Sequence, residues 1–176
     1  MIKTSFLAAL IVAATASVAS AGGQAGSIGV GAEYQLSGLG GVSVNYDAGQ
    51  FHLGGFLGYY DPNGPDNTVV EIGGRFYYHV HSTAMSDFGI GGGFGLASEP
   101  AGGGPNNNQN TNVYLEPGFQ IRLFIASNVA LSFTGGLVIG LIDAGGAAIT
   151  GQGIGGAPAF DTVGFSGGAG VHYYFF

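Results

Sequence analysis

The sequence predicts an all-β fold, an eight-stranded antiparallel up-and-down transmembrane barrel, on three observations. Apolar and polar residues alternate with a period of two along eight segments. Only 7% of the 176 residues are charged, compared with about 25% in typical globular chains. Beyond the first residues there is no uninterrupted apolar stretch of the roughly 20 residues that a spanning helix needs. We therefore expect the chain to cross a membrane with strands.

The first 21 residues predict an export signal. Lys3 precedes the apolar run Phe6–Val18, which is too short for a spanning helix, and Ala19 to Ala21 offers small residues for cleavage. Cleavage after Ala21 would leave residues 22–176 as one barrel domain, and the loss of Lys3 would change the formal charge from −7 to −8. Such an acidic domain is not expected to bind nucleic acid. The sequence contains no cysteine, which excludes disulfides.

The expected strands follow one another along the chain, each with one apolar face. Taken at every second residue, the apolar faces run over 28–36, 42–46, 51–59, 70–80, 88–96, 113–123, 129–141 and 163–175. The opposite faces carry glycine, small polar groups and most of the charges of these segments. Pro117 removes a hydrogen-bond donor from the sixth segment and predicts a bulge or a locally unpaired position there.

The connecting segments alternate in length. Short turns are expected at 47–50, 81–85 and 125–128, whereas 61–68, 98–112 and 143–160 are long and 37–41 is brief. This alternation is typical of outer-membrane barrels with both termini on the periplasmic side. Because unpaired backbone groups in hydrocarbon cost several kcal/mol each, the last strand is expected to pair with the first.

The apolar face is expected to meet lipid and the glycine-rich face to line the interior. A soluble barrel would need that weakly charged face as its water-facing surface, which the composition does not support. Small residues fit the narrow interior of an eight-stranded barrel. Interfacial tyrosines are expected at the rims. Tyr34 and Tyr59 would lie at the outer rim, and Tyr46, Tyr78 and Tyr173 at the periplasmic rim.

The fifth segment has an almost bare inner face. Asp87 is followed at every second residue by glycine, as far as Gly95. This pattern leaves interior space that large side chains of other strands are expected to fill. The candidates are Phe56, Tyr60, Tyr77, Tyr114 and Tyr174.

The carboxyl end, Gly170–Phe176, resembles the signal by which outer-membrane proteins engage the barrel-assembly machinery. That signal is a glycine, two residues, an aromatic, any residue and an aromatic; it fits Gly170, Tyr173 and Phe175, with Phe176 left over. With this ending, the residues after the signal resemble the small outer-membrane barrels of the OmpA/OmpX type over their whole length. The resemblance implies a monomer in the outer membrane of a Gram-negative-type envelope, in contact with its lipid and with the assembly machinery during biogenesis. No cofactor or metal is expected.

Charged residues on the inner faces are the candidate site. An ionisable group inside a narrow membrane barrel is costly unless it is paired, so we expect a luminal charged network with a structural or gating role. Toward the outer half it would contain Glu33, Glu71, Arg75 and Glu116, and toward the periplasmic half His52, His79, Asp87 and Arg122. Paired charges would form a structural plug, whereas an excess of carboxylates would favour a narrow cation-preferring pore.

The functional prediction is a non-enzymatic envelope protein with a structural or surface-interaction role. Its acidic outer loops would be available to an extracellular ligand. The cation-preferring pore is the first alternative. The second is a hydrolase acting on lipid A, for which His79, His81 and Ser82 are the candidate residues. No motif in the sequence places a carboxylate beside them.

Overall fold

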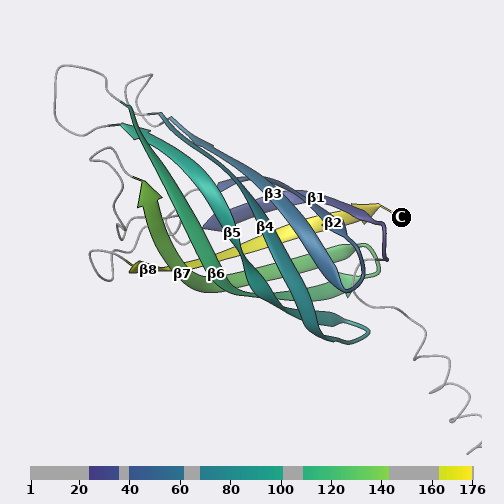
Figure 1. Cartoon of the computed structure of the whole chain (residues 1–176). Helices are drawn as coiled ribbons and strands as arrows, with labels where there is room; N and C mark the ends of the chain where they lie inside the picture. The colour runs from purple at the N-terminus through teal and green to yellow at the C-terminus, as the bar shows by residue number, and fades with distance from the viewer. Residues whose placement is uncertain (1–23, 36–39, 62–67, 101–108, 143–162, 176) are drawn as a thin grey trace, which may run out of the picture.

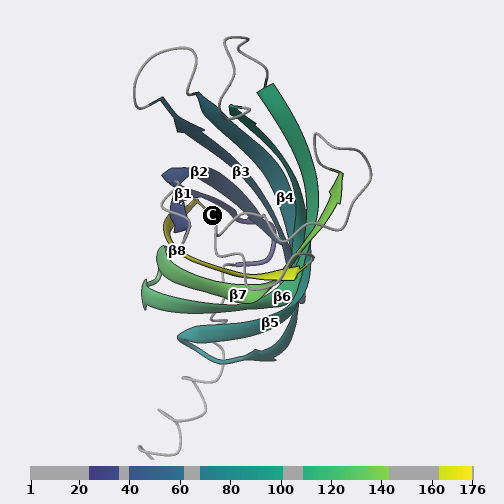
Figure 2. The same cartoon turned by 90° about the vertical axis from the view of Figure 1, so that its left-hand side faces the viewer.

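Eight antiparallel strands follow one another around a closed barrel (Figures 1 and 2). The computed structural model describes residues 24–35, 40–61, 68–100, 109–142 and 163–175. The strands are β1 (Ile28–Gln35), β2 (Gly40–Asp47), β3 (Phe51–Tyr60), β4 (Val69–Ser82), β5 (Ser86–Pro100), β6 (Gln109–Ala126), β7 (Val129–Ile142) and β8 (Val163–Phe175). Within these ranges no helix is long and apolar enough to span a membrane.

The pairing of the last strand with the first closes the sheet. β8 pairs with β1 from Ile28 opposite Phe175 to Gln35 opposite Gly168. The predicted fold class, an antiparallel eight-stranded barrel, is confirmed. This closure leaves every strand with a hydrogen-bonded neighbour on each side, so the barrel has no open sheet edge.

The two ends of the barrel differ. β1 begins and β8 ends beside the three short turns, and we call this the turn end; the opposite end is the loop end (Figure 1). The turns comprise residues 48–50, 83–85 and 127–128, close to their expected positions. The expected signal, residues 1–21, lies outside the described residues, as does Phe176.

Two strands are longer than predicted. β5 continues to Pro100 and β6 begins at Gln109, although 98–112 was expected to be a loop. Ser98 pairs with Thr111, and Ala97 with Asn112. Their residues are polar and do not alternate with apolar ones, so side-chain periodicity gives no signal. Backbone hydrogen bonding to a partner strand holds this part of the ladder instead.

Pro117 lies in a strand that is regular on one side and interrupted on the other. It pairs with Gly92 of β5 without a change of register. On the β7 side Leu115 and Gly118 have partners, but Glu116 and Pro117 between them do not. The prediction of a locally unpaired position is therefore correct. The register shifts of β6 lie elsewhere, near Tyr114 and Ala126.

The turn between β2 and β3 places two groups that matter for the interior. Gly49 has a φ of 89°, a conformation that favours glycine. Its N–H donates to Asp47 Oδ1 over 2.8 Å, and its carbonyl oxygen lies 2.8 Å from His79 Nδ1. The turn thus fixes both a carboxylate and a carbonyl acceptor at the mouth of the turn end.

The distribution of polarity is the reverse of that in a soluble protein. Large apolar side chains are exposed on the exterior, among them Val44, Leu57, Ile72, Phe94, Phe133 and Val171. The buried side chains include Arg122, Asp47, His52 and Glu71, which lie inside the barrel. The five tyrosines expected on the apolar face are all exposed on it. The predicted assignment of the two faces is correct for the barrel as folded.

The bare glycine face is filled by side chains from neighbouring strands. Tyr77 lies over Gly89, Arg75 over Gly93 and Tyr114 over Gly95. Four of the five predicted fillers are buried: Phe56, Tyr77, Tyr114 and Tyr174. Only Tyr77 and Tyr114 lie over glycines of β5, whereas Phe56 lies over Gly73 of β4 and Tyr174 over Gly29 of β1. Tyr60 is not, because it ends β3 at the loop end and is 54% exposed. An interior of this width is packed with side chains.

Replacing Gly29 with alanine is expected to destabilise the barrel by about 1–3 kcal/mol, because the new methyl group would overpack the interior. It would lie 2.8 Å from Tyr174 Cε1, and that ring cannot shift without disturbing its hydrogen bond to Arg122. Gly55→Ala is the matched control, since its methyl group would meet no atom closer than 3.8 Å. Urea unfolding in detergent compares the two variants. Equal stability would contradict the packing seen here.

Candidate functional site

A group of polar side chains crosses the interior at the turn end, and Arg122 is at its centre. We call this group the turn-end cluster: Asp47, His52, His79, Asp87, Arg122 and Tyr174. Arg122 Nη2 lies 2.7 Å from Asp47 Oδ2 and 2.7 Å from Asp87 Oδ2. Its Nη1 donates to Tyr174 Oη over 3.0 Å. The guanidinium is 1% exposed, so these charge-assisted contacts are shielded from water.

His79 is the second junction of the turn-end cluster. Its Nε2 lies 3.0 Å from Arg122 Nη2 and 2.9 Å from His52 Nδ1. Its Nδ1 lies 2.8 Å from the carbonyl oxygen of Gly49. A single imidazole thus connects β3, β4, β6 and the turn between β2 and β3.

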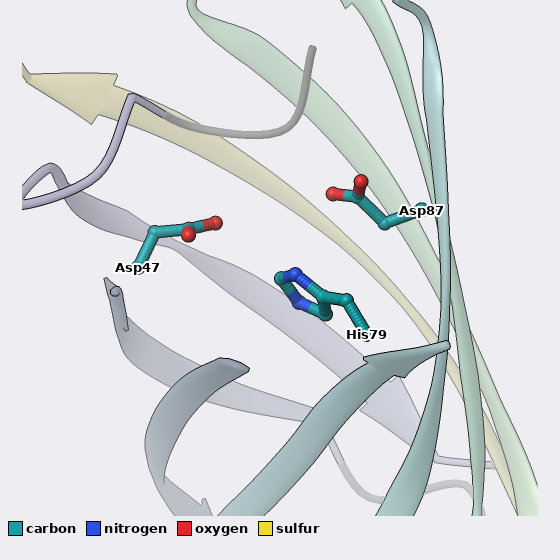
Figure 3. A group of neighbouring side chains, drawn as sticks. All are labelled: Asp47, His79 and Asp87. Carbon is teal, nitrogen blue, oxygen red and sulfur yellow. The ribbon is translucent and has the colours of Figure 1, made fainter. Parts of the chain in front are cut away.

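Figure 3 shows Asp47, His79 and Asp87 converging from three different strands. Their nitrogen and oxygen atoms lie within 4.8 Å of one another, and these are residue types that can bind metal ions. Arg122 Nη2, however, contacts all three side chains and fills the space between them. The group therefore contains its own cation, the guanidinium.

A second group, the central cluster, lies further toward the loop end. It consists of Glu33, Ser43, Arg75, Glu116 and His172. Arg75 forms an ion pair with Glu33 through Nη1, and its Nε lies 4.0 Å from Glu116 Oε2. Its guanidinium carbon also lies 4.5 Å from the centre of the Phe56 ring, an arrangement typical of a cation–π contact. Arg75 of β4 thereby contacts side chains of β1, β3 and β6.

A serine–histidine–carboxylate contact occurs in the central cluster, but it is not a catalytic triad. Ser43 Oγ lies 2.6 Å from His172 Nε2, and Glu33 Oε1 lies 3.6 Å from the same nitrogen. In a triad the acid would orient the opposite nitrogen. His172 Nδ1 has no hydrogen-bond partner among the described residues. Ser43 is also 2% exposed, so a substrate could not reach it.

Glu71 lies closest to the loop end among the buried acids of the interior. Tyr114 Oη donates to Glu71 Oε1 over 2.8 Å, and both side chains are buried. The tyrosine also covers Gly95, so one ring both fills interior volume and satisfies a carboxylate. A buried carboxylate with a hydrogen-bond donor costs far less than an isolated one.

The structure places the eight predicted network residues in two groups and one pair, with His52 beside His79 in the turn-end cluster. Arg122, His79 and Asp87 belong to the turn-end cluster, Arg75, Glu33 and Glu116 to the central cluster, and Glu71 contacts Tyr114. Their structural or gating role remains a prediction. Of the expected assembly signal, Tyr173 and Phe175 point outward and Gly170 lies on the inner face opposite Glu33.

Three important residues were missing from the predicted network: Asp47, His172 and Tyr174. Asp47 was expected on the inner face of the second segment and at the start of the turn that follows, and it lies after Ser43 and Asn45 on the inner face of β2. That alternation was the signal that could have included it. His172 was equally visible on the inner face of β8, but its partners, Ser43 and Glu33, lie on other strands and more than a hundred residues earlier.

The residues considered for lipid A hydrolysis are not brought together. His79 points into the turn-end cluster, whereas His81 and Ser82 are exposed. The pairing of β4 with β5 shifts register between His79 and His81, so the regular alternation of faces is interrupted between the two histidines.

Comparisons with known proteins establish the fold. No protein-family model matches the sequence, and no curated protein matches it. The N-terminal β-barrel domain of Pseudomonas aeruginosa OprF is similar in structure, with a TM-score of 0.56 and 12% identity over 86% of this chain and 98% of that one. Ail, the attachment invasion locus protein of Yersinia pestis, aligns over 86% of this chain and 100% of its own, with a TM-score of 0.44 and 10% identity. At these identities the likeness to OprF concerns architecture alone.

Proposed function

We propose that this chain is a non-enzymatic integral outer-membrane barrel with a closed lumen, serving a structural or surface-interaction role. The observation that carries the proposal is the reversed polarity of the barrel. Its apolar side chains are outside and its charged side chains inside. In water such an exterior would aggregate, whereas in a bilayer it matches the acyl chains. The fold shared with the OprF barrel domain supports this placement.

The filled interior favours a closed lumen over the cation-preferring pore. Arg122 forms ion pairs with carboxylates of β2 and β5, and Arg75 links β4 to β1. Rings and the Arg75 side chain occupy the glycine-lined space between them. Continuous water would have to displace these buried ion pairs, which is costly in a narrow interior.

The arrangement also favours a role at the barrel ends over chemistry inside it. The serine–histidine contact is buried and lacks triad geometry, and His79 is separated from His81 and Ser82. At the loop end β3 and β4 end together at the Tyr60–Val69 pair, and β5 and β6 run on to the Pro100–Gln109 pair (Figure 1). We place the surface-interaction role at this end, with an extracellular ligand as the partner and a monomer as the functional unit.

Planar-bilayer recording tests the closed lumen. The refolded full chain is expected to give no steady current in salt at neutral pH, because both clusters block the path. Glu71→Gln and Glu116→Gln should be equally silent. Insertion is verified in the same preparation by protection of the chain from protease. A steady current in the inserted wild-type protein that either substitution reduces would support the pore and contradict the proposal.

A further inference from the structure

We propose that a groove on the exterior of β3, β4 and β5 binds one acyl chain of a zwitterionic phospholipid. The groove has a volume of about 440 Å³, and its lining includes Leu53, Phe76 and Phe94. Such a site rests on the outer-membrane placement proposed above. It also goes beyond that placement, because it distinguishes one lipid from the rest of the surrounding bilayer.

The groove arises where large side chains alternate with glycine on three neighbouring strands. Two adjacent rows of outward-facing residues form it: Leu53, Phe76 and Gly92 in one row, and Gly55, Gly74 and Phe94 in the other. The ring of Phe76 is held against that of Phe51, with 5.5 Å between the ring centres. The exterior is therefore hollow between side chains that are already positioned by their neighbours.

Strand packing explains only one of the three outward-facing glycines. A methyl group on Gly92 would lie 2.4 Å from the carbonyl oxygen of Glu116, so the close approach of β6 requires glycine there. A methyl group on Gly74 would meet no atom closer than 3.4 Å, and one on Gly55 none closer than 3.8 Å. Glycine weakens a strand and often marks a position where a ligand approaches the backbone closely. The open space above Gly74 fits that second role.

The depth of the groove in the bilayer determines what can fill it. Phe94 lies midway between the Tyr59 and Tyr78 levels of the barrel, and Phe76 lies between Phe94 and the Tyr78 level. The groove is thus continuous with the lipid-facing surface, in the half of the hydrocarbon layer nearer the turn end. Water is absent at this depth, so a lipid tail is the molecule available to occupy it.

The charges of the barrel favour a zwitterionic lipid over an anionic one. The only two arginines, Arg75 and Arg122, are buried in the interior, and the only lysine, Lys3, lies outside the described residues. Across the described part of the chain, the exterior therefore has no lysine or arginine to bind the phosphates of an acidic lipid. The head group is expected near Tyr78, whose exposed ring lies at the turn-end rim.

Close packing is the driving force for binding, because lipid tails are as apolar as the side chains that they meet. A loosely fitting detergent tail leaves part of the hollow without contacts, and those dispersion contacts are lost. A chain that lies along the groove recovers them. Roughly ten additional carbon–carbon contacts correspond to about a tenfold preference for the bound chain.

Mass spectrometry of intact complexes tests the site. The full chain is refolded in detergent and titrated with dioleoyl phosphatidylethanolamine, and the concentration at which half of the barrels retain one lipid is measured. Gly74→Leu fills the groove, and the first carbon of its side chain meets no atom closer than 3.4 Å. It should raise that concentration about tenfold. Val30→Leu, which enlarges an exposed residue of β1 outside the groove, should behave as the wild type.

Tryptophan fluorescence gives a second readout that does not need a groove-filling variant, because the natural chain has no tryptophan. Leu57→Trp reports the groove, since Leu57 pairs with Ile72 and lies diagonally across from Gly74. Phe133→Trp, on the exterior of β7, is the reference. A phospholipid brominated at mid-chain should half-quench the Leu57→Trp protein at about one tenth of the lipid-to-detergent ratio that the reference needs.

Equal half-retention concentrations for the wild type and Gly74→Leu would overturn the binding site, as would equal quenching midpoints for the two tryptophan variants. The quenching result decides the matter if Gly74→Leu does not fold. Tighter retention of dioleoyl phosphatidylglycerol or lipid A than of the phosphatidylethanolamine would overturn the zwitterionic lipid as the occupant. Failure of the outer-membrane placement is a separate result, because the wild-type chain would then not insert into phospholipid vesicles at all.

Discussion

Arg122→Met is expected to lower the free energy of unfolding by about 3–5 kcal/mol, because it leaves two buried carboxylates without their cation. Asp47 and Asp87 each lie 2.7 Å from the guanidinium and are 1–2% exposed. Methionine fills much of the volume of the arginine stem, so the loss reports mainly the charge and its hydrogen bonds. The measurement is equilibrium unfolding in urea, with the barrel refolded in lipid vesicles.

The control for Arg122→Met is the triple variant that also carries Asp47→Asn and Asp87→Asn. Removing both carboxylate charges should recover most of the lost stability, since the main penalty is an uncompensated buried charge. His79 keeps its bonds to Gly49 and His52 in that variant. If Arg122→Met alone lowered the free energy of unfolding no more than the substitution of an exposed residue does, the turn-end cluster would contribute little to folding.

Phe94→Arg is expected to destabilise the membrane-inserted barrel by about 2–4 kcal/mol, the range for a cation near the middle of the lipid-facing band. Phe94 is exposed on the exterior of β5 and pairs with Gly74. That pairing places it midway between the Tyr59 level and the Tyr78 level of the barrel. Unfolding from lipid vesicles measures the effect.

Ile90→Arg is the matched control, because Ile90 lies on the same face of β5 four residues toward the turn end and pairs with Tyr78. An arginine there can extend its head group to the interface, so the expected cost is at most about 1 kcal/mol. If both substitutions were equally mild in vesicles, the exterior would not be facing hydrocarbon, and the proposed location would be wrong.

The charged and polar groups of the interior lie at three different levels. Arg122 and its partners close the turn end, whereas Arg75, Glu33 and Glu116 lie deeper, and Glu71 with Tyr114 lies nearest the loop end. With three polar levels in series, we expect the path to stay blocked even where one of them is disturbed. A soluble core of this size would instead be apolar.

The number of strands, their order and the direction of each side chain follow from the sequence alone. Alternation with a period of two is a property of a single strand, so Val44 points outward and Asn45 inward whatever strand lies beside them. Short turns and long connections then require neighbouring strands to be antiparallel. Side-chain periodicity gives no signal at 98–112, where polar residues continue the ladder, and none at Tyr60, where the strand ends before its ring can be covered.

The partners inside the barrel were decided only by the tertiary structure. The sequence put Arg122 and Asp87 on neighbouring strands, but it could not show that Asp47 of β2 would reach the same nitrogen. Nor could it show that His172 would meet Ser43, or that Glu71 would bond to Tyr114. Contacts across the interior depend on how far each strand is staggered as the sheet closes, which is a property of all eight strands together. Periodicity therefore determines which side chains face inward, and closure determines which of them touch.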